Sequence, residues 1–174
     1  MTMKESTVKK NYVFRGKILN VRCDDVALED GTPCKREIVE HTGGAAMACV
    51  VDGSVVLVRQ YRYAYGEETL EIPAGKLDAR EDPLCAAIRE LREETGLIAK
   101  NPRHLCTFYP SPGYTEEKIH VYLTTEVERG EQQLDEGEFL NVEYLPLADA
   151  VQRAKRGEIK DAKTLIALLH LQEK

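Results

Sequence analysis

The stretch Gly75–Leu97, GKLDAREDPLCAAIRELREETGL, decides how the rest of the chain is interpreted. Asp82 followed by Pro83 predicts the start of a helix, because an Asp side chain caps free backbone N–H groups and Pro suits the first helical position. Gly96 predicts the stop, since glycine adopts the left-handed conformation that ends many helices. The stretch therefore predicts a helix of roughly three to four turns.

This predicted helix has an apolar face and an acidic one. The apolar positions recur at helical spacing and predict the buried stripe: Leu84, Ile88 and Leu91. Glu90, Glu93 and Glu94 fall together on another face, because residues three and four apart on a helix are neighbours. Arg89 and Arg92 relieve part of the repulsion, but a divalent cation relieves it better. The acidic face is therefore a candidate metal site, and a solvated helix surface is the alternative.

The spacing extends beyond the three glutamates. Gly75, five residues, Glu81, seven residues and then Arg89–Leu97 (RELREETGL) resemble the Nudix box at every defined position. A solvated acidic face does not explain both glycines, the arginine and the spacing together. The resemblance implies an α/β fold, the Nudix α/β/α sandwich with a mixed sheet. The alternation of strand-like and helix-like segments after Gly43 agrees with it.

Composition limits the class of protein. The 174 residues fit a single folded protein with a substantial core, and the net charge of −6 argues against a general nucleic-acid binder. No apolar run approaches membrane-spanning length and the N-terminus lacks a signal-peptide pattern, so we expect no membrane association. The five cysteines are odd in number and widely spaced, which suggests reduced thiols and a cytoplasmic location.

The chain divides at Gly43–Gly44. Residues 1–42 read as a β-rich, polar lead-in that we expect to form an antiparallel β segment rather than an independent domain. Residues 43–174 are expected to form the Nudix hydrolase domain, with a hairpin at Asp52–Gly53 and a last helix capped by Asp161. Members of the family branch identified below are commonly dimers that exchange N-terminal strands. That resemblance implies a homodimer with residues 1–42 as the dimerisation element.

The metal ligands are predicted from the box. Glu90 and Glu94 are the first choice, with Glu93 as the third candidate and as a residue required for turnover. Oxygen ligands of this type suit Mg²⁺, with Mn²⁺ as a possible substitute. The resemblance adds Glu81 as a supporting residue and the carbonyl of Ala74 as a further ligand. Arg89 is expected to orient the glutamates by ion pairing; we group it with the catalytic residues.

Outside the box the chain resembles the ADP-ribose pyrophosphatase branch of the family along most of its length. The matching pieces are Arg36–His41 (REIVEH), Val58–Arg62 (VRQYR), Glu71–Leu77 (EIPAGKL) and Ser111–Gly113 (SPG). The branch also has a proline about sixteen residues after the last box glycine, where this chain has Pro112. The resemblance implies hydrolysis of ADP-ribose, an acid anhydride, to AMP and ribose 5-phosphate, with Mg²⁺ ions between the phosphates and the glutamates.

Substrate contacts are expected upstream of the box and at the proline. A guanidinium group can donate two parallel hydrogen bonds to phosphate oxygens, so Arg59 and Arg62 are candidates to bind the anionic substrate. The alternative is that both are ordinary surface charges. Glu71 and Pro112 complete the predicted substrate-binding set.

The acidic loop Asp135–Glu138 gains a role from the same resemblance, because the general base of this branch comes from such a loop. Glu136 is then the expected base and Glu138 a further metal ligand, although a two-residue slip would exchange them. Glu116 and Glu117 are the other candidates for the base, and a solvated acidic turn is the simplest alternative.

Two other functions remain open. One keeps the chemistry and changes the substrate to another nucleoside diphosphate derivative, such as a nucleotide sugar, NADH or a diadenosine polyphosphate. The other is a non-catalytic sensor that binds ADP-ribose. Such sensors typically lose box glutamates, and this chain retains them all.

Overall fold

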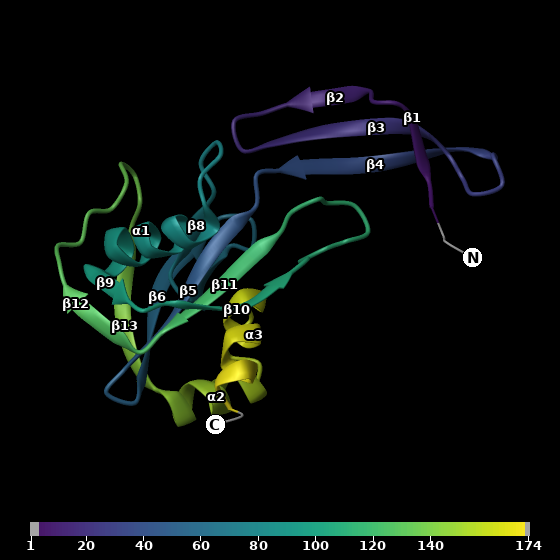
Figure 1. Cartoon of the computed structure of the whole chain (residues 1–174). Helices are drawn as coiled ribbons and strands as arrows, with labels where there is room; N and C mark the ends of the chain where they lie inside the picture. Colours follow the sequence, from purple (N-terminus) through teal and green to yellow (C-terminus); the bar gives the residue numbers. More distant parts are fainter. Residues whose placement is uncertain (1–3, 173–174) are drawn as a thin grey trace. The chain divides into compact units, whose positions relative to one another are not determined.

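The computed structural model describes residues 4–172 (Figure 1). In chain order the elements are β1 (Ser6–Lys9), β2 (Tyr12–Arg15), β3 (Leu19–Ala27), β4 (Pro33–His41), β5 (Gly44–Val51), β6 (Ser54–Arg62), β7 (Glu67–Glu71), β8 (Ala74–Lys76), α1 (Pro83–Thr95), β9 (Leu97–Lys100), β10 (Arg103–Phe108), β11 (Ile119–Thr124), β12 (Glu126–Arg129), β13 (Leu140–Pro146), α2 (Leu147–Lys155) and α3 (Ala162–Leu171). They form two compact units. The first contains the described residues up to Gly43 together with Tyr109–Lys118, and the second contains Gly44–Phe108 and the described residues from Ile119 onward.

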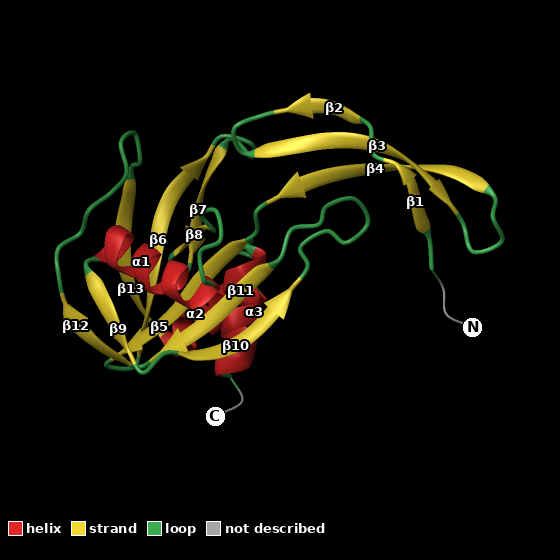
Figure 2. Cartoon of the chain, turned by 45° about the horizontal axis from the view of Figure 1, so that its top comes forward, coloured by secondary structure: helices red, strands yellow, loops and turns green. Residues whose placement is uncertain are grey.

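The first unit is an antiparallel sheet, as predicted for the N-terminal segment (Figure 2). β1 and β2 pair with successive parts of one edge of β3, and β4 pairs along the other edge. The turn between β3 and β4 contains Gly31, whose φ of 85° lies in the left-handed region. Glycine adopts this conformation at no steric cost, which suits it to the turn.

The loop Tyr109–Lys118 belongs to this first unit, which the sequence did not indicate. The Val39 N–H donates to the carbonyl of Tyr114 (2.7 Å), and the Glu116 N–H donates to the carbonyl of Val39 (3.2 Å). These are backbone hydrogen bonds, which most residue types make equally well, so composition carries no signal for them.

The second unit is built on a mixed sheet. Its strands follow the order β10-β11-β5-β6-β13, with β7 paired to β6 and β8 paired to β5. β11 and β5 are parallel, whereas the other pairs of this sheet are antiparallel. Helix α1 covers one face, and α2 and α3 cover the other (Figure 1). This is the α/β/α sandwich with a mixed sheet that the sequence predicts.

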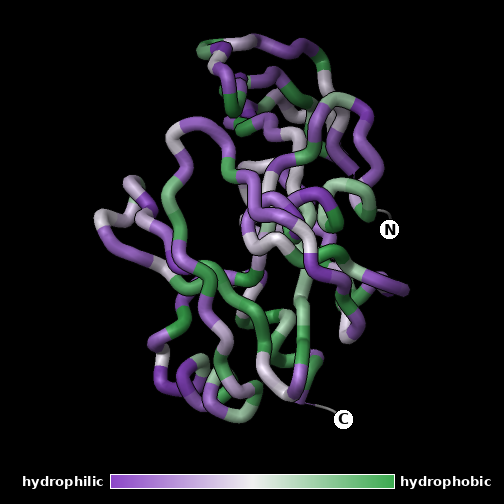
Figure 3. Tube along the Cα trace, turned by 90° about the vertical axis from the view of Figure 1, so that its left-hand side faces the viewer, coloured by the Kyte–Doolittle hydropathy of each residue, from purple (hydrophilic) through white to green (hydrophobic). Residues whose placement is uncertain are grey.

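The core of this unit lies on both faces of β5. Ala46 and Ala48 pack with α2 and α3 on one side, while Ala45, Met47 and Cys49 pack with α1 on the other. A strand buried on both faces reads as an uninterrupted apolar run. Hydrophobic stretches of the chain are green in Figure 3. The five cysteines are free thiols. Within residues 4–172 no helix is long and apolar enough to cross a membrane.

Helix α1 begins and ends at the predicted residues. One carboxylate oxygen of Asp82 accepts hydrogen bonds from the N–H groups of Leu84 (2.9 Å) and Cys85 (3.2 Å). Gly96 has a φ of 72° and its N–H donates to the carbonyl of Arg92. The buried face differs from the predicted stripe, because Leu84 and Ile88 are only partly buried and the buried positions are Ala86, Ala87, Leu91 and Glu94. The small alanines bring α1 close to the sheet.

Candidate active site

Arg89 is the centre of the box and contacts three of its glutamates. Its Nε and Nη2 donate to the two carboxylate oxygens of Glu81, both at 2.9 Å. Its Nη1 donates to Glu90 (2.7 Å) and to Glu93 (2.9 Å). The guanidinium lowers the pKa of Glu81, and these carboxylates raise the pKa of Arg89. Arg89 therefore orients glutamates by ion pairing, the geometry expected for its predicted role.

Glu90 and Glu94 are withdrawn from water beside one another on α1. Glu94 is 1% exposed, and its Oε2 accepts a hydrogen bond from the Ala74 N–H (3.1 Å). Burial raises its pKa to about 8, with further contributions from the charges of Glu90 and Glu138. Burial also raises the pKa of Glu90, and Glu93 and Glu138 act in the same direction. Two neighbouring carboxylates in such surroundings favour a proton or a cation.

Gly75 explains how Glu90 is accommodated. It lies in β8, which pairs antiparallel with β5. A Cβ atom at this position would lie 1.9 Å from Oε1 of Glu90, which is less than any real contact. The box glycine is thus required by a close approach between a strand backbone and a carboxylate of the helix.

The residues present fit a hard divalent cation. Glu90, Glu94 and the neighbouring backbone offer oxygen donors only, and buried like charges are stabilised by a cation between them. Within the described part of the chain, no group of three or more His, Cys, Asp or Glu side chains has metal-binding geometry. Three box glutamates are directed at Arg89 instead. A metal would therefore bind through carboxylate oxygens that Arg89 leaves available.

The two predicted glutamates of the acidic loop differ in burial. Glu138 is half-buried and its charge acts on both Glu90 and Glu94. Glu136 is exposed at the tip of the turn, where the Glu138 N–H donates to the carbonyl of Asp135 (3.0 Å). Both roles stay predictions: Glu138 as a metal ligand and Glu136 as the general base.

The alternative bases belong to the other unit. Glu116 pairs with Arg22 (3.5 Å), and a carboxylate oxygen of Glu117 lies 3.3 Å from Nδ1 of His41, all within the first unit. Pro112 also lies in that unit and is exposed, so its role as a substrate contact stays a prediction.

The two candidate arginines diverge. They are three residues apart in β6, and side chains at odd separations point to opposite faces of a strand. Arg59 pairs with Glu143 of β13 (2.5 Å), whereas Arg62 pairs with Glu71 of β7 through two bonds of 2.7 and 2.6 Å. A single diphosphate group is therefore not expected to contact both.

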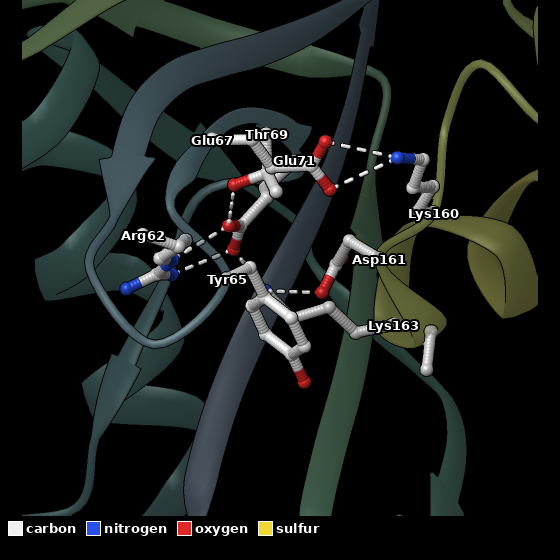
Figure 4. Close-up of a pocket in the computed structure, with 9 residues that line it drawn as sticks. Arg62, Tyr65, Glu67, Thr69, Glu71, Lys160, Asp161 and Lys163 are labelled. Atoms are coloured by element: carbon white, nitrogen blue, oxygen red, sulfur yellow. Dashed lines mark hydrogen bonds and ion pairs between the residues drawn. The ribbon is translucent and has the colours of Figure 1, made fainter.

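Arg62 and Glu71 line a pocket of about 410 Å³ in the second unit (Figure 4). Its other lining residues are Tyr65, Glu67, Thr69, Lys160, Asp161, Ala162 and Lys163. The sequence predicts Asp161 as a helix cap, which the structure confirms, but it gives no signal for Lys160 or Lys163. Both lysines lie after α2, far from the box in sequence. Their spacing gives no indication that they lie near Glu71.

Comparison with known proteins finds two matching family models and several similar proteins. The NUDIX domain family matches residues 41–168, and the nucleoside diphosphate sugar hydrolase N-terminal domain matches residues 5–39. The chain is similar to the ADP-ribose pyrophosphatase of Bacillus subtilis (strain 168), with 41% identity over 99% of this chain and 95% of that protein. It is also 40% identical to the methanol dehydrogenase activator of Bacillus methanolicus, over 97% of this chain and 92% of that protein.

A solved structure has the same fold. The crystal structure of an ADP compounds hydrolase superimposes with a TM-score of 0.87, covering 99% of this chain and 95% of that one. Sequence identity to it is 23%.

Proposed function

This chain belongs to the Nudix family and is a Nudix hydrolase that uses divalent metal ions, and we propose that its substrate is ADP-ribose. The products are AMP and ribose 5-phosphate, formed when water attacks one phosphorus of the diphosphate. Similarity to an ADP-ribose pyrophosphatase over nearly the whole of both chains is the observation that supports this substrate.

Each box residue has a separate proposed role in this reaction. Glu90, Glu94 and the Ala74 carbonyl would hold the metal, with Glu81 and Glu138 in support. We propose Mg²⁺, with Mn²⁺ as a substitute, which would neutralise phosphate oxygens and lower the pKa of the attacking water. Arg89 keeps Glu90 and Glu93 in place through the bonds described above. Glu136 is the proposed general base, and Glu93 is the alternative within the box.

Arg62 is the better placed of the two candidate arginines for an anionic substrate. It lines the 410 Å³ pocket, and the charge of Glu94 acts on it. Arg59 faces Glu143 and lies at a different, more open surface with Tyr61 and Phe139. We assign the diphosphate to Arg62 and leave Arg59 and Pro112 as secondary contacts. Glu71, predicted to bind substrate, is only 2% exposed and already holds Arg62, so we assign it no direct contact.

A nucleotide sugar is the second candidate substrate. The match of residues 5–39 to the N-terminal domain of nucleoside diphosphate sugar hydrolases supports it. The box chemistry is the same for both, so the decision rests on the group attached to the second phosphate.

We also propose a cytoplasmic homodimer. The free thiols suit a reducing compartment. The first unit leaves apolar side chains exposed on and beside β1 and β2, namely Val8, Val13, Phe14 and Ile18. Another copy of this chain is the proposed partner for that surface.

A product screen tests the substrate. ADP-ribose, ADP-glucose, GDP-mannose, NADH, diadenosine polyphosphates and nucleoside triphosphates are incubated with Mg²⁺, and each has an EDTA control. We expect the highest kcat/KM for ADP-ribose, AMP and ribose 5-phosphate as products, and no turnover with EDTA. A higher kcat/KM for GDP-mannose or ADP-glucose would replace ADP-ribose by a nucleotide sugar. Binding without turnover in the presence of metal would contradict an enzymatic role.

Glu93→Gln tests the box itself. The substitution keeps the size of the side chain and removes its charge, so turnover should be abolished while the fold persists, as measured by circular dichroism. Unchanged turnover would remove Glu93 from the mechanism.

A further inference from the structure

Glu71 is a buried carboxylate that the box chemistry does not use. It is 2% exposed, and four hydrogen-bond donors converge on it. Arg62 donates through Nε and Nη2, the Thr69 hydroxyl donates at 2.5 Å, and the Lys163 ammonium donates to Oε2. Its own burial opposes ionisation, but these donors outweigh it and lower the pKa to about 2. Glu71 is therefore a fixed anion between two cations.

Lys163 reaches Glu71 from another part of the chain. It lies in the first turn of α3, and its side chain is only 13% exposed. Its Nζ also donates to Oδ1 of Asp161, the N-cap of the same helix (2.9 Å). A buried ammonium is costly unless it is paired, and here Glu71 and Asp161 both accept hydrogen bonds from it.

The start of α3 is itself attached to the strand that carries Glu71. Oδ2 of Asp161 accepts from both the N–H and the hydroxyl of Thr164, at 2.9 and 2.5 Å. The Thr164 hydroxyl in turn accepts from the N–H of Ile72 (2.8 Å), the residue after Glu71. Thr164 and Ile72 are both fully buried. The helix cap thus fixes Lys163 relative to Glu71.

The opposite side of Glu71 is occupied by Arg62. Both Nε and Nη2 of Arg62 are used by the two carboxylate oxygens, which locks the guanidinium plane. Among the described residues no acceptor binds the remaining nitrogen, Nη1, and the side chain is 40% exposed in the pocket of Figure 4. An arginine locked along one edge presents its other N–H groups to a ligand at little entropic cost.

We propose that Lys163 is a positioning residue for substrate binding: through Glu71 it holds Arg62 so that the free edge of the guanidinium faces the diphosphate. This inference rests on the proposed contact between Arg62 and the substrate. Lys163 balances the charge of Glu71 from the side of α3, so that Glu71 stays ionised and in place when Arg62 engages a phosphate. Without Lys163, the negative charge of Glu71 is balanced by Arg62 alone. The N–H groups of Arg62 must then serve both Glu71 and the substrate.

The test compares Lys163→Met, Lys163→Arg and a charge-matched control, Lys100→Met. Lys100 forms an exposed pair with Glu128 in the second unit (2.8 Å) and lies outside the pocket. Steady-state kinetics should show KM about tenfold higher for Lys163→Met, the loss expected for one charge-assisted hydrogen bond, with kcat changed less than about threefold. Lys163→Arg should recover most of this loss, and Lys100→Met should match the wild type. An unchanged KM in folded Lys163→Met protein overturns the proposal.

A double-mutant cycle shows whether Lys163 acts through Glu71. Glu71→Gln keeps the shape and removes the charge, so adding Lys163→Met to it should raise KM by less than about twofold further. If Lys163→Met raises KM by the same factor in the Glu71→Gln protein as in the wild type, Lys163 does not act through Glu71. The urea midpoint of each variant is also measured. A variant that is only less stable should have a lower urea midpoint without a selective rise in KM.

Binding of ADP, measured by calorimetry, separates this inference from the proposed substrate. ADP carries the diphosphate without the second sugar, so its Kd should rise about tenfold in Lys163→Met and remain unchanged in Lys100→Met. If the wild type failed to hydrolyse ADP-ribose, the substrate assignment would be wrong, while the ratio of the ADP Kd values would still decide the role of Lys163. Equal Kd values in wild type and Lys163→Met would reject that role.

Discussion

Glu94 shows how a residue of the box departs from the usual behaviour of its type. A glutamate in the last turn of a surface helix is ordinarily solvated, yet this one is 1% exposed. The Ala74 N–H gives it one hydrogen bond, and Glu90 and Glu138 oppose its charge. Such an arrangement is unfavourable for the free protein and becomes favourable when a cation is bound. Local rules of burial are broken where function requires it.

The first prediction concerns Gly75→Ala. Its new Cβ would lie 1.9 Å from Oε1 of Glu90, so the carboxylate must move and cannot return to its present position. A displacement of about 1 Å at a catalytic group costs about 100-fold in rate, and we expect kcat/KM to fall by about that factor. Metal affinity, measured by Mn²⁺ titration, should fall as it does in Glu90→Gln. Wild-type Mn²⁺ affinity in Gly75→Ala would contradict the assignment of Glu90.

The second prediction concerns Glu71 and acid stability. The folded pKa of about 2 lies below the ordinary value of 4.5, so between these values the unfolded chain binds more protons. Stability from this group is therefore complete above pH 4.5 and is lost as pH falls toward 2, by up to roughly 3 kcal/mol. Urea unfolding of the wild type and Glu71→Gln should show a difference at pH 6 that shrinks by pH 3. A difference independent of pH would mean that Glu71 is not an anion in the folded protein.

At the scale of elements, the acidic loop is tied to the end of α1. The last carbonyls of a helix lack partners within it. The side-chain amide of Gln132 donates to the carbonyl of Glu94 (2.6 Å), and the N–H of Gln133 donates to the carbonyl of Glu93 (2.9 Å). The loop that carries Glu136 and Glu138 is thus attached to the helix that carries Glu90 and Glu94, the proposed metal ligands.

The third prediction separates the two glutamines of this loop. Gln132→Ala removes a side-chain hydrogen bond, so we expect kcat to fall about three- to tenfold, the value of one such bond, with KM little changed. Gln133 contributes only its backbone to the attachment, so Gln133→Ala is the matched control and should retain wild-type kcat. Equal effects of the two substitutions in steady-state kinetics would show that the Gln132 side chain does not position the loop.

At the scale of the whole molecule, the exposed apolar surface of the first unit is the feature that supports the proposed homodimer. Val8 and Val13 are 69% and 67% exposed, and Phe14 is 55% exposed. Strands with such surfaces are prone to pair or pack with another chain. An exposed sheet of this kind is the physical basis for the proposed homodimer.

The fourth prediction is a dimer that depends on this surface. Light scattering after size exclusion should give twice the chain mass of 19.6 kDa. Phe14→Glu and Val13→Glu together should shift the mass toward one chain, because buried charges without partners oppose association. Leu169→Glu places the same charge at an exposed apolar site of α3 and should leave the dimer intact. A wild-type protein with the mass of one chain would contradict the homodimer.

Much of the second unit could be predicted from local patterns. Asp82, Pro83 and Gly96 bound α1 because capping depends on residues close in sequence. Asp52 and Gly53 have φ values of 49° and 75°, as a tight hairpin turn between β5 and β6 requires. The short strands β8, β9 and β12 were not predicted, because three or four residues carry too little periodicity to stand out.

The sequence by itself determined the family, the helix that carries the site and the identity of the box glutamates, because all of these depend on residue type at fixed spacing. Tertiary structure alone decided that Arg59 pairs with Glu143, that the charge of Glu138 acts on Glu90 and Glu94, and that Lys163 meets Glu71. The reason is the same for each. These contacts join residues far apart in the chain, and their partners are set by how strands and helices pack, which no local pattern records.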